Sequence, residues 1–334
     1  MSRTSIRGFS LVELMVAMTI GLILLGGAIS VLYSSKLTYN ENERVARLQE
    51  SGRAAVEVML RDLRAGGYKG CNEFIASDTM TNALASPTSL MSNFSAQVQG
   101  YESTGTGTWS PAVDAAIVSP RSGSDILVVR TTPSNAPTFI TNAAMASATA
   151  DISVDNPLGR TIVNNSYAII SDCQNAAVFK MNSLTAGTIA TGGANLGLAF
   201  RQGSRVVPVD TVVYYIRDSA TVRNGVRNPS LWRVTVAEGA QELVEGVEQM
   251  QVLYGVASAS NPLVVASYEK ASAVTNWNRV ISVSIALLIR SVEPTSPVDE
   301  SRTYNLLGTD VVTPNDRYQR TLYTTTVALR NTTQ

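Results

Sequence analysis

The sequence predicts an α+β protein in which one long amino-terminal helix packs on a mostly antiparallel β-sheet head. Two observations lead to this prediction. An uninterrupted apolar run near the amino terminus continues into a segment with helical periodicity, and no proline occurs before Pro87. The later part of the chain contains repeated β-branched runs bounded by Gly, Pro, Asn and Asp, a pattern typical of strands.

The composition excludes several classes of function. The 334 residues include 26 basic and 26 acidic side chains, so the chain has no overall basic field and we expect no nucleic-acid partner. Histidine is absent, which removes serine–histidine triads and HExxH metalloprotease sites. No GxSxG, P-loop or calcium-loop pattern occurs. We therefore expect no enzyme, cofactor or metal site. A paired-carboxylate glycosidase stays open as an alternative, because its two acids can lie far apart in a chain.

The amino-terminal apolar run has the length of a membrane span. Residues 11–32 are 22 residues whose only charge is Glu13, and a bilayer-spanning helix needs about 20. Arg3 and Arg7 precede the run, so the positive-inside rule places residues 1–8 in the cytoplasm and everything after Tyr33 outside. A secretory signal peptide or a simple anchor is the alternative, but the run is longer than a cleavable core and contains a carboxylate.

Glu13 needs a partner. An ionisable side chain costs about 2.5 to 3.5 kcal/mol at the centre of a membrane helix and less near its edge. The apolar run contains no cation that could pair with it. We therefore expect the partner of Glu13 on another molecule.

The stretch RGFSLVEL, residues 7–14, resembles the processing signal of type IV pilins and type II secretion pseudopilins. The resemblance implies that a prepilin peptidase removes the leader, residues 1–8, by cutting between Gly8 and Phe9, and that Phe9 is then N-methylated. Glu13 becomes the fifth residue of the mature chain, where the family has its glutamate. The new amine of one subunit could then pair with Glu13 of the next and set their register, because an unpaired buried charge is costly.

The predicted helix covers residues 9–66, with its transmembrane segment at about 11–32. Beyond Tyr33 the apolar residues recur at spacings of three and four, which predicts one buried stripe. Gly66 and Gly67 supply a stop signal. Gly52 lies on the stripe and indicates either close contact with a sheet or a weak point in the helix.

The head is predicted to cover residues 67–334, with a loop-rich part at about 71–175. The β-branched runs predict strands at residues 125–130, 161–171, 177–181, 206–217, 231–237, 250–256, 280–289 and 323–329. In residues 280–289 the alternation predicts one buried face and one partly wet face. Residues 241–248 are predicted to form a short helical or extended link.

Cys71 and Cys173 are the two cysteines of the chain. A head outside the cytoplasm lies in an oxidising compartment, so we expect them to form a disulfide. Two free buried thiols are the alternative.

Three stretches resemble the minor pilins of type IV pili: residues 65–71, 243–256 and 324–331. This resemblance implies a subunit of the tip complex that primes pilus assembly. Its implied partners are other minor pilins, the major pilin, a tip-associated adhesin, the prepilin peptidase and the inner membrane. The head is then periplasmic before assembly and extracellular, at the pilus tip, afterwards. A J-type pseudopilin of a type II secretion system is the first alternative, and a membrane-anchored adhesin or ligand-binding module is the second.

Overall fold

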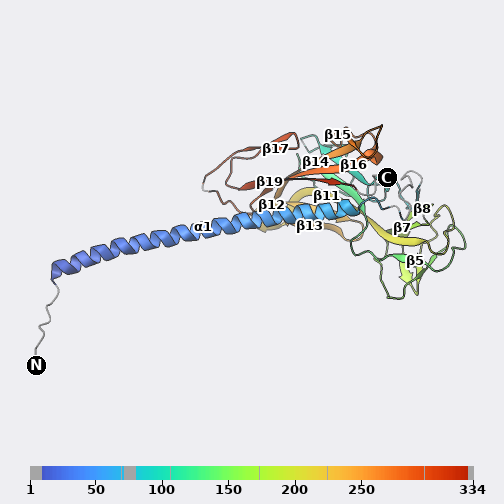
Figure 1. Cartoon of the computed structure of the whole chain (residues 1–334), viewed down its shortest axis with the longest axis horizontal. Helices are drawn as coiled ribbons and strands as arrows, with labels where there is room; N and C mark the ends of the chain where they lie inside the picture. Colours follow the sequence, from blue (N-terminus) through green and yellow to red (C-terminus); the bar gives the residue numbers. More distant parts are fainter. Residues whose placement is uncertain are drawn as a thin grey trace, which may run out of the picture. The chain divides into compact units, whose positions relative to one another are not determined.

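The computed structural model describes residues 10–68, 70, 80–105, 107–172, 174–223, 225–296 and 298–329. The chain divides into two units, Met1–Gln49 and Glu50–Gln334. Helix α1, Leu11–Ala65, begins in the first unit and ends in the second. It is followed by a large and mostly antiparallel β-sheet head, which confirms the predicted α+β fold (Figure 1).

Helix α1 ends beside strand β4 (Ile126–Thr131) of the head, where the Ala65 carbonyl accepts hydrogen bonds from Thr132. Gly67 adopts a positive φ of 76°, which a glycine reaches without steric cost. Its N–H donates to the carbonyl of Arg130 at 2.9 Å, and Gly66 forms a β-bridge with Thr131. The predicted glycine stop therefore also joins the helix to the sheet.

The last turns of α1, from residue 50 onward, pack on the head. Ala55, Met59 and Leu63 recur every four residues and are fully buried. A Cβ atom at Gly52 would lie 2.3 Å from the ring of Tyr323, so this glycine permits the close approach that the sequence predicted. The alternative, a weak point in the helix, does not explain this contact.

The larger sheet has thirteen strands, ordered around one long central strand. Its members are β1 (Thr81–Asn82), β2 (Val98–Ser103), β3 (Trp109–Ser110), β4 (Ile126–Thr131), β5 (Phe139–Thr141), β6 (Ile152–Asp155), β7 (Ser166–Ser171), β8 (Ala176–Met181), β9 (Ser183–Thr185), β10 (Thr188–Ala190), β11 (Arg205–Arg223), β12 (Val226–Thr235) and β13 (Gly239–Glu245). The first part of β11 pairs with β5 and β7, and the later part pairs with β4 and β12. Strand β11 therefore links two halves of the head.

The smaller sheet has four antiparallel strands in the order β15-β14-β16-β19. Their bounds are β14 (Val247–Ala257), β15 (Val265–Glu269), β16 (Val280–Arg290) and β19 (Arg320–Ala328), and a 3-10 turn, Trp277–Arg279, precedes β16. Strands β14, β15 and β16 lie side by side in Figure 1. A separate hairpin of β17 (Thr303–Leu306) and β18 (Thr309–Val312) lies between β16 and β19 in the sequence.

Strand β16 is buried on both faces, whereas its alternation predicted one partly wet face. The reason is the β17–β18 hairpin. Leu306 of this hairpin packs with Ala286 and Leu288 of β16 in one buried cluster. Because the covering segment is distant in sequence from β16, the local pattern could not indicate it.

All eight predicted strands have a counterpart in the structure, although their ends differ. The predicted strand at residues 161–171 begins only at Ser166, because Asn165 has a φ of 66° and forms a turn. The predicted link at residues 241–248 is extended, as β13 and the start of β14. Strand β2 lies in the stretch expected to be loop-rich. Its sequence, VQGYES, has no β-branched run, but pairing with β4 buries it.

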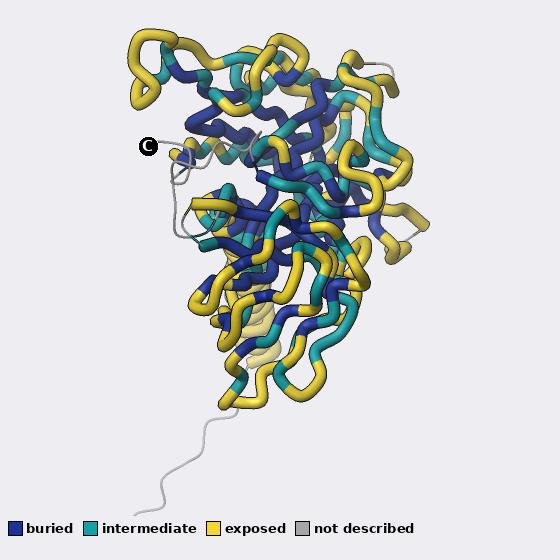
Figure 2. The backbone as a smooth tube through the Cα atoms, turned by 90° about the vertical axis from the view of Figure 1, so that its right-hand side faces the viewer, coloured by how far each residue is buried: buried dark blue, intermediate teal, exposed yellow. Residues whose placement is uncertain are grey.

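Figure 2 shows long buried stretches of the head in dark blue. Three apolar clusters of described residues belong to the thirteen-stranded sheet, and two of them lie in its two halves. Phe139, Phe179 and Phe200 belong to the cluster around β5–β10. Tyr101, Tyr215 and Trp232 belong to the cluster around β2, β4, β11 and β12. The head thus has separate cores on either side of the β11 crossover.

Candidate assembly site

Ser10 and Glu13 satisfy each other's backbone N–H groups at the start of helix α1. The Ser10 amide donates to Glu13 Oε2 at 3.3 Å, and the Glu13 amide donates to Ser10 Oγ at 3.2 Å. This reciprocal pair is a capping box, in which the side chains complete hydrogen bonds that the first helical turn lacks. The sequence analysis identified Glu13 but missed this contact. The Ser-x-x-Glu spacing immediately before an apolar run is the signal that could have indicated it.

Among the described residues, the capping box leaves the charge of Glu13 without a counter-ion. Its side-chain contacts in the described part of the chain come from Ser10, which carries no charge. The Glu13 side chain is exposed. The carboxylate can therefore cap its own helix and still be available to a cation of another molecule.

The first half of α1 presents an exposed apolar surface. In the described part of the chain, α1 is the one helix that is long and apolar enough to cross a membrane. Residues 11–39 are all exposed, and large side chains such as Leu11 and Leu25 remain 75% and 57% accessible. Apolar surface of this extent requires lipid or other protein to cover it.

The other predicted site residues lie outside the described residues. They are Gly8 and Phe9 of the processing junction and Cys71 and Cys173 of the expected disulfide. Cleavage, methylation and the disulfide therefore stay predictions.

A buried polar contact joins α1 to the head. Asp62 Oδ2 accepts hydrogen bonds from the Tyr214 hydroxyl at 2.6 Å and from Arg233 Nε at 3.2 Å. Burial, together with the negative charge of Asp62, raises the pKa of Tyr214, so its hydroxyl keeps its proton and donates. The sequence analysis missed Asp62. It lies beside Leu63 on the apolar stripe, where a buried carboxylate requires a partner.

A second polar network holds the segment between β16 and β19. Arg320 donates to both oxygens of Asp316, each at 2.7 Å, and its Nε donates to Glu248 Oε2 at 2.6 Å. Arg290 Nη2 donates to Asn228 Oδ1 at 2.9 Å, and its guanidinium stacks over the ring of Tyr318. Bidentate pairs of this kind fix geometry as well as charge. The network connects strands β12, β14, β16 and β19.

Asp125, just before β4, joins the two sheets. Its Oδ1 accepts from the Ser103 amide and its Oδ2 accepts from the Val252 amide of β14, both at 2.9 Å. Burial and, next, the nearby charge of Glu102 raise the pKa of Asp125 to about 7, although the two amide hydrogen bonds oppose the shift. No sequence pattern indicated this residue, because its partners come from distant segments.

Among the described residues, no group of three or more Cys, Asp or Glu side chains is placed to hold a metal ion. The buried carboxylates instead accept hydrogen bonds from arginine, lysine, tyrosine or backbone amides. This chemistry joins structural elements.

Two family models match the chain. Residues 3–29 match the prokaryotic N-terminal methylation motif, and residues 213–331 match the model described as Type IV Pilus-assembly protein W, PilW. The comparison with curated proteins gives no match. The methylation motif, the long apolar helix and the antiparallel head define a type IV pilin-like protein. Within that class, the two matches together support a type IV pilus minor pilin with a PilW domain.

The PilW match covers the carboxyl-terminal part of the head. It begins at Val213 within β11 and includes the whole four-stranded sheet. Residues 243–256 and 324–331, two of the three stretches in which the sequence resembles a minor pilin, lie inside it, and residues 65–71 lie outside. Tyr214, Arg233, Glu248 and Arg320 also lie inside it. Tyr214 and Arg233 bind Asp62 of α1, which lies outside the match, whereas the contact between Arg320 and Glu248 is internal to it.

Proposed function

We propose that this chain acts at the tip of the type IV pilus, in the complex of minor pilins that primes assembly. The observation that carries the proposal is the combination of a pilin-type amino terminus with a PilW domain in a head of more than 260 residues. A filament packs its subunits side by side, so a large head is accommodated more readily at the end than along the shaft. A tip subunit has no further subunit above it.

Assembly begins, in this proposal, with removal of residues 1–8 and methylation of Phe9. The new amine then pairs with Glu13 of a neighbouring subunit, since each charge offsets the burial cost of the other. The exposed apolar half of α1 holds the subunit in the inner membrane with a periplasmic head before assembly. It packs among other pilin helices afterwards, when the head is extracellular.

The partners in this proposal are other minor pilins, the major pilin, a tip-associated adhesin and the prepilin peptidase. No contact of the described residues selects among these partners. The PilW domain supports the pilus assignment over the J-type pseudopilin alternative.

Two measurements test the proposal. Mass spectrometry of the protein from sheared pili should find methylated Phe9 as the first residue, and an intact Met1 there would refute processing. Gold labelling of an epitope in the head should mark filament ends only. Label along the shaft would contradict the tip position while keeping membership of the pilus. Complete absence from purified filaments would contradict both.

A further inference from the structure

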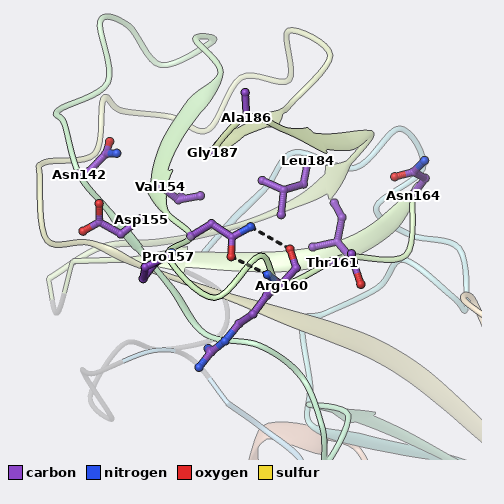
Figure 3. A pocket seen from close by; sticks show the side chains of 12 residues that line it. Asn142, Val154, Asp155, Pro157, Arg160, Thr161, Asn164, Leu184, Ala186 and Gly187 are labelled. Carbon is purple, nitrogen blue, oxygen red and sulfur yellow. Dashed lines mark hydrogen bonds between the residues drawn. The ribbon is translucent and has the colours of Figure 1, made fainter.

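A hollow of about 920 Å³ lies in the first half of the head, away from the PilW domain (Figure 3). Strand β6, the loop at residues 156–164 and the turn between β9 and β10 form its walls. The hollow includes neither the capping box of Ser10 and Glu13 nor the polar contacts of Asp62, Arg320 and Asp125. A concave site with convergent polar groups is the usual form of a ligand-binding site.

The walls of the hollow are held in place without ligand. Asn156 brackets the main chain of Arg160: its Nδ2 donates to the Arg160 carbonyl, and its Oδ1 accepts from the Arg160 amide, both at 2.8 Å. The dashed lines in Figure 3 mark these two bonds. Arg160 Nη1 also donates to the carbonyl of Thr138 at 3.1 Å. The loop that lines the hollow is therefore pre-organised, which lowers the entropic cost of binding.

Four polar side chains of the lining make no hydrogen bond within the described part of the chain: Thr161 and the three planar groups of Asn142, Asp155 and Asn164. Nearby polar residues differ, because Asn156 holds Arg160 and Asp151 accepts from the Thr191 amide at 2.9 Å. Each of the three planar groups offers two polar atoms at a fixed spacing, a geometry that matches neighbouring hydroxyls. In Figure 3, Asn142 and Asp155 lie on one side of the hollow and Asn164 on the other.

Between these polar groups the surface is apolar. Leu184 lies between them in Figure 3, and both Leu184 and Ile162 pack against the buried cluster around β5–β10. The apolar side chains are thus held against the core of this half of the head. They offer a surface for the C–H face of a ring, while the polar groups face its edges.

The lining contains one acidic and one basic residue, Asp155 and Arg160, and therefore has no net charge. A strongly charged ligand has no complementary field here. A single carboxylate also cannot supply the acid and base pair of a glycosidase, so the hollow supports binding without hydrolysis.

We propose that this hollow binds a neutral carbohydrate, with Asn142, Asp155 and Asn164 taking its hydroxyls and Leu184 contacting the face of its ring. The inference goes beyond the proposed tip position and does not depend on it. It gives the head a direct ligand in addition to its protein partners.

The test uses the full chain in a detergent without a sugar headgroup. Saturation-transfer NMR with methyl glycosides of neutral hexoses and N-acetylhexosamines, at concentrations on the order of 10 mM, should detect weak binding of at least one of them. Asp155→Ala and Asn142→Ala should each weaken that binding at least about tenfold. Both side chains lack partners, so neither change should lower the melting temperature.

Asp299→Ala is the matched control, because Asp299 is an exposed carboxylate outside the hollow. It should leave binding unchanged. Absence of binding across the panel would overturn the proposal. So would binding that the two lining substitutions do not weaken.

Discussion

The Glu13 carboxylate has two roles at the start of α1. Glu13 accepts the Ser10 amide, as a capping box requires, and its charge is left for a partner on another subunit. Glutamine serves a capping box as well as glutamate does, but it is uncharged. The two roles can therefore be separated by substitution.

We predict that Glu13→Gln leaves membrane insertion intact but removes the subunit from filaments, because the amide keeps the cap and loses the charge. Ser10→Ala should do the reverse: it weakens the helix start by about 1 kcal/mol and keeps incorporation. Immunoblots of membranes and of sheared filaments measure both. Normal incorporation of Glu13→Gln would remove charge pairing from assembly. Equal loss in both variants would assign the effect to capping.

Asp62 is the second residue whose loss we expect to be costly. Asp62→Ala leaves Tyr214 and Arg233 without their shared acceptor, and breaking a buried ion pair costs about 3 kcal/mol or more. The lower end applies, because Arg233 keeps a contact with Glu238 at 3.1 Å. Chemical denaturation of the full chain should show this loss. Arg61→Ala is the control, since its side chain is 56% exposed and lies 3.8 Å from Asp62. Equal losses in the two variants would contradict the role of the buried pair.

At the scale of elements, local patterns identified α1 and eight strands because each signal lies within its own segment. The apolar run, the stripe and the glycine stop define α1, and β-branched runs define strands such as β16. Strand β2 and the β17–β18 hairpin were missed, because their burial depends on partners distant in sequence. The contact between Gly52 and β19 was predicted in part. The position of Gly52 on the apolar stripe indicated close contact with a sheet, but the sequence did not indicate which strand.

We predict that Gly52→Ala destabilises the head, although alanine normally favours a helix over glycine by about 1 kcal/mol. The new Cβ would lie 2.3 Å from the Tyr323 ring, and overpacking costs about 1 to 3 kcal/mol. In the double variant, Tyr323→Leu should restore part of the lost stability. Denaturation of the two single variants and the double variant, analysed as a double-mutant cycle, measures this recovery. A stabilising Gly52→Ala, or strict additivity with Tyr323→Leu, would contradict close packing at this point.

For the whole molecule, the sequence predicted the class of fold but not how its parts connect. The amino-terminal motif indicated the pilin class and Glu13 directly, because these signals need only neighbouring residues. The crossover of β11 between two half-sheets depends on the pairing of its residues 205–214 with the distant strands β7 and β4, which no local pattern encodes. The same holds for the hollow, whose lining comes from segments more than 40 residues apart.

Asp125 illustrates this long-range coupling, because it joins the start of β4 to β14 and so links the PilW domain to the rest of the head. It faces Glu102 and Lys270, which pair at 2.8 Å, and the buried ring of Tyr254. Burial raises its pKa from an ordinary value of 3.8 to about 7. Between these two values the folded state keeps a proton that the unfolded state releases.

The folded head therefore loses stability as pH rises from about 4 to about 7, and the contribution of Asp125 is fully present only below the lower value. We predict that Asp125→Asn removes this slope. It also lowers stability at every pH, because the NH2 group of the new side chain must face one of the two backbone N–H donors. Glu102→Gln should move the slope to lower pH, since a neighbouring negative charge is removed. Denaturation curves of the full chain across this range, with Asp299→Asn as an exposed control, measure the effect. An unchanged slope in Asp125→Asn would show that another group controls the pH dependence of the joint between the two sheets.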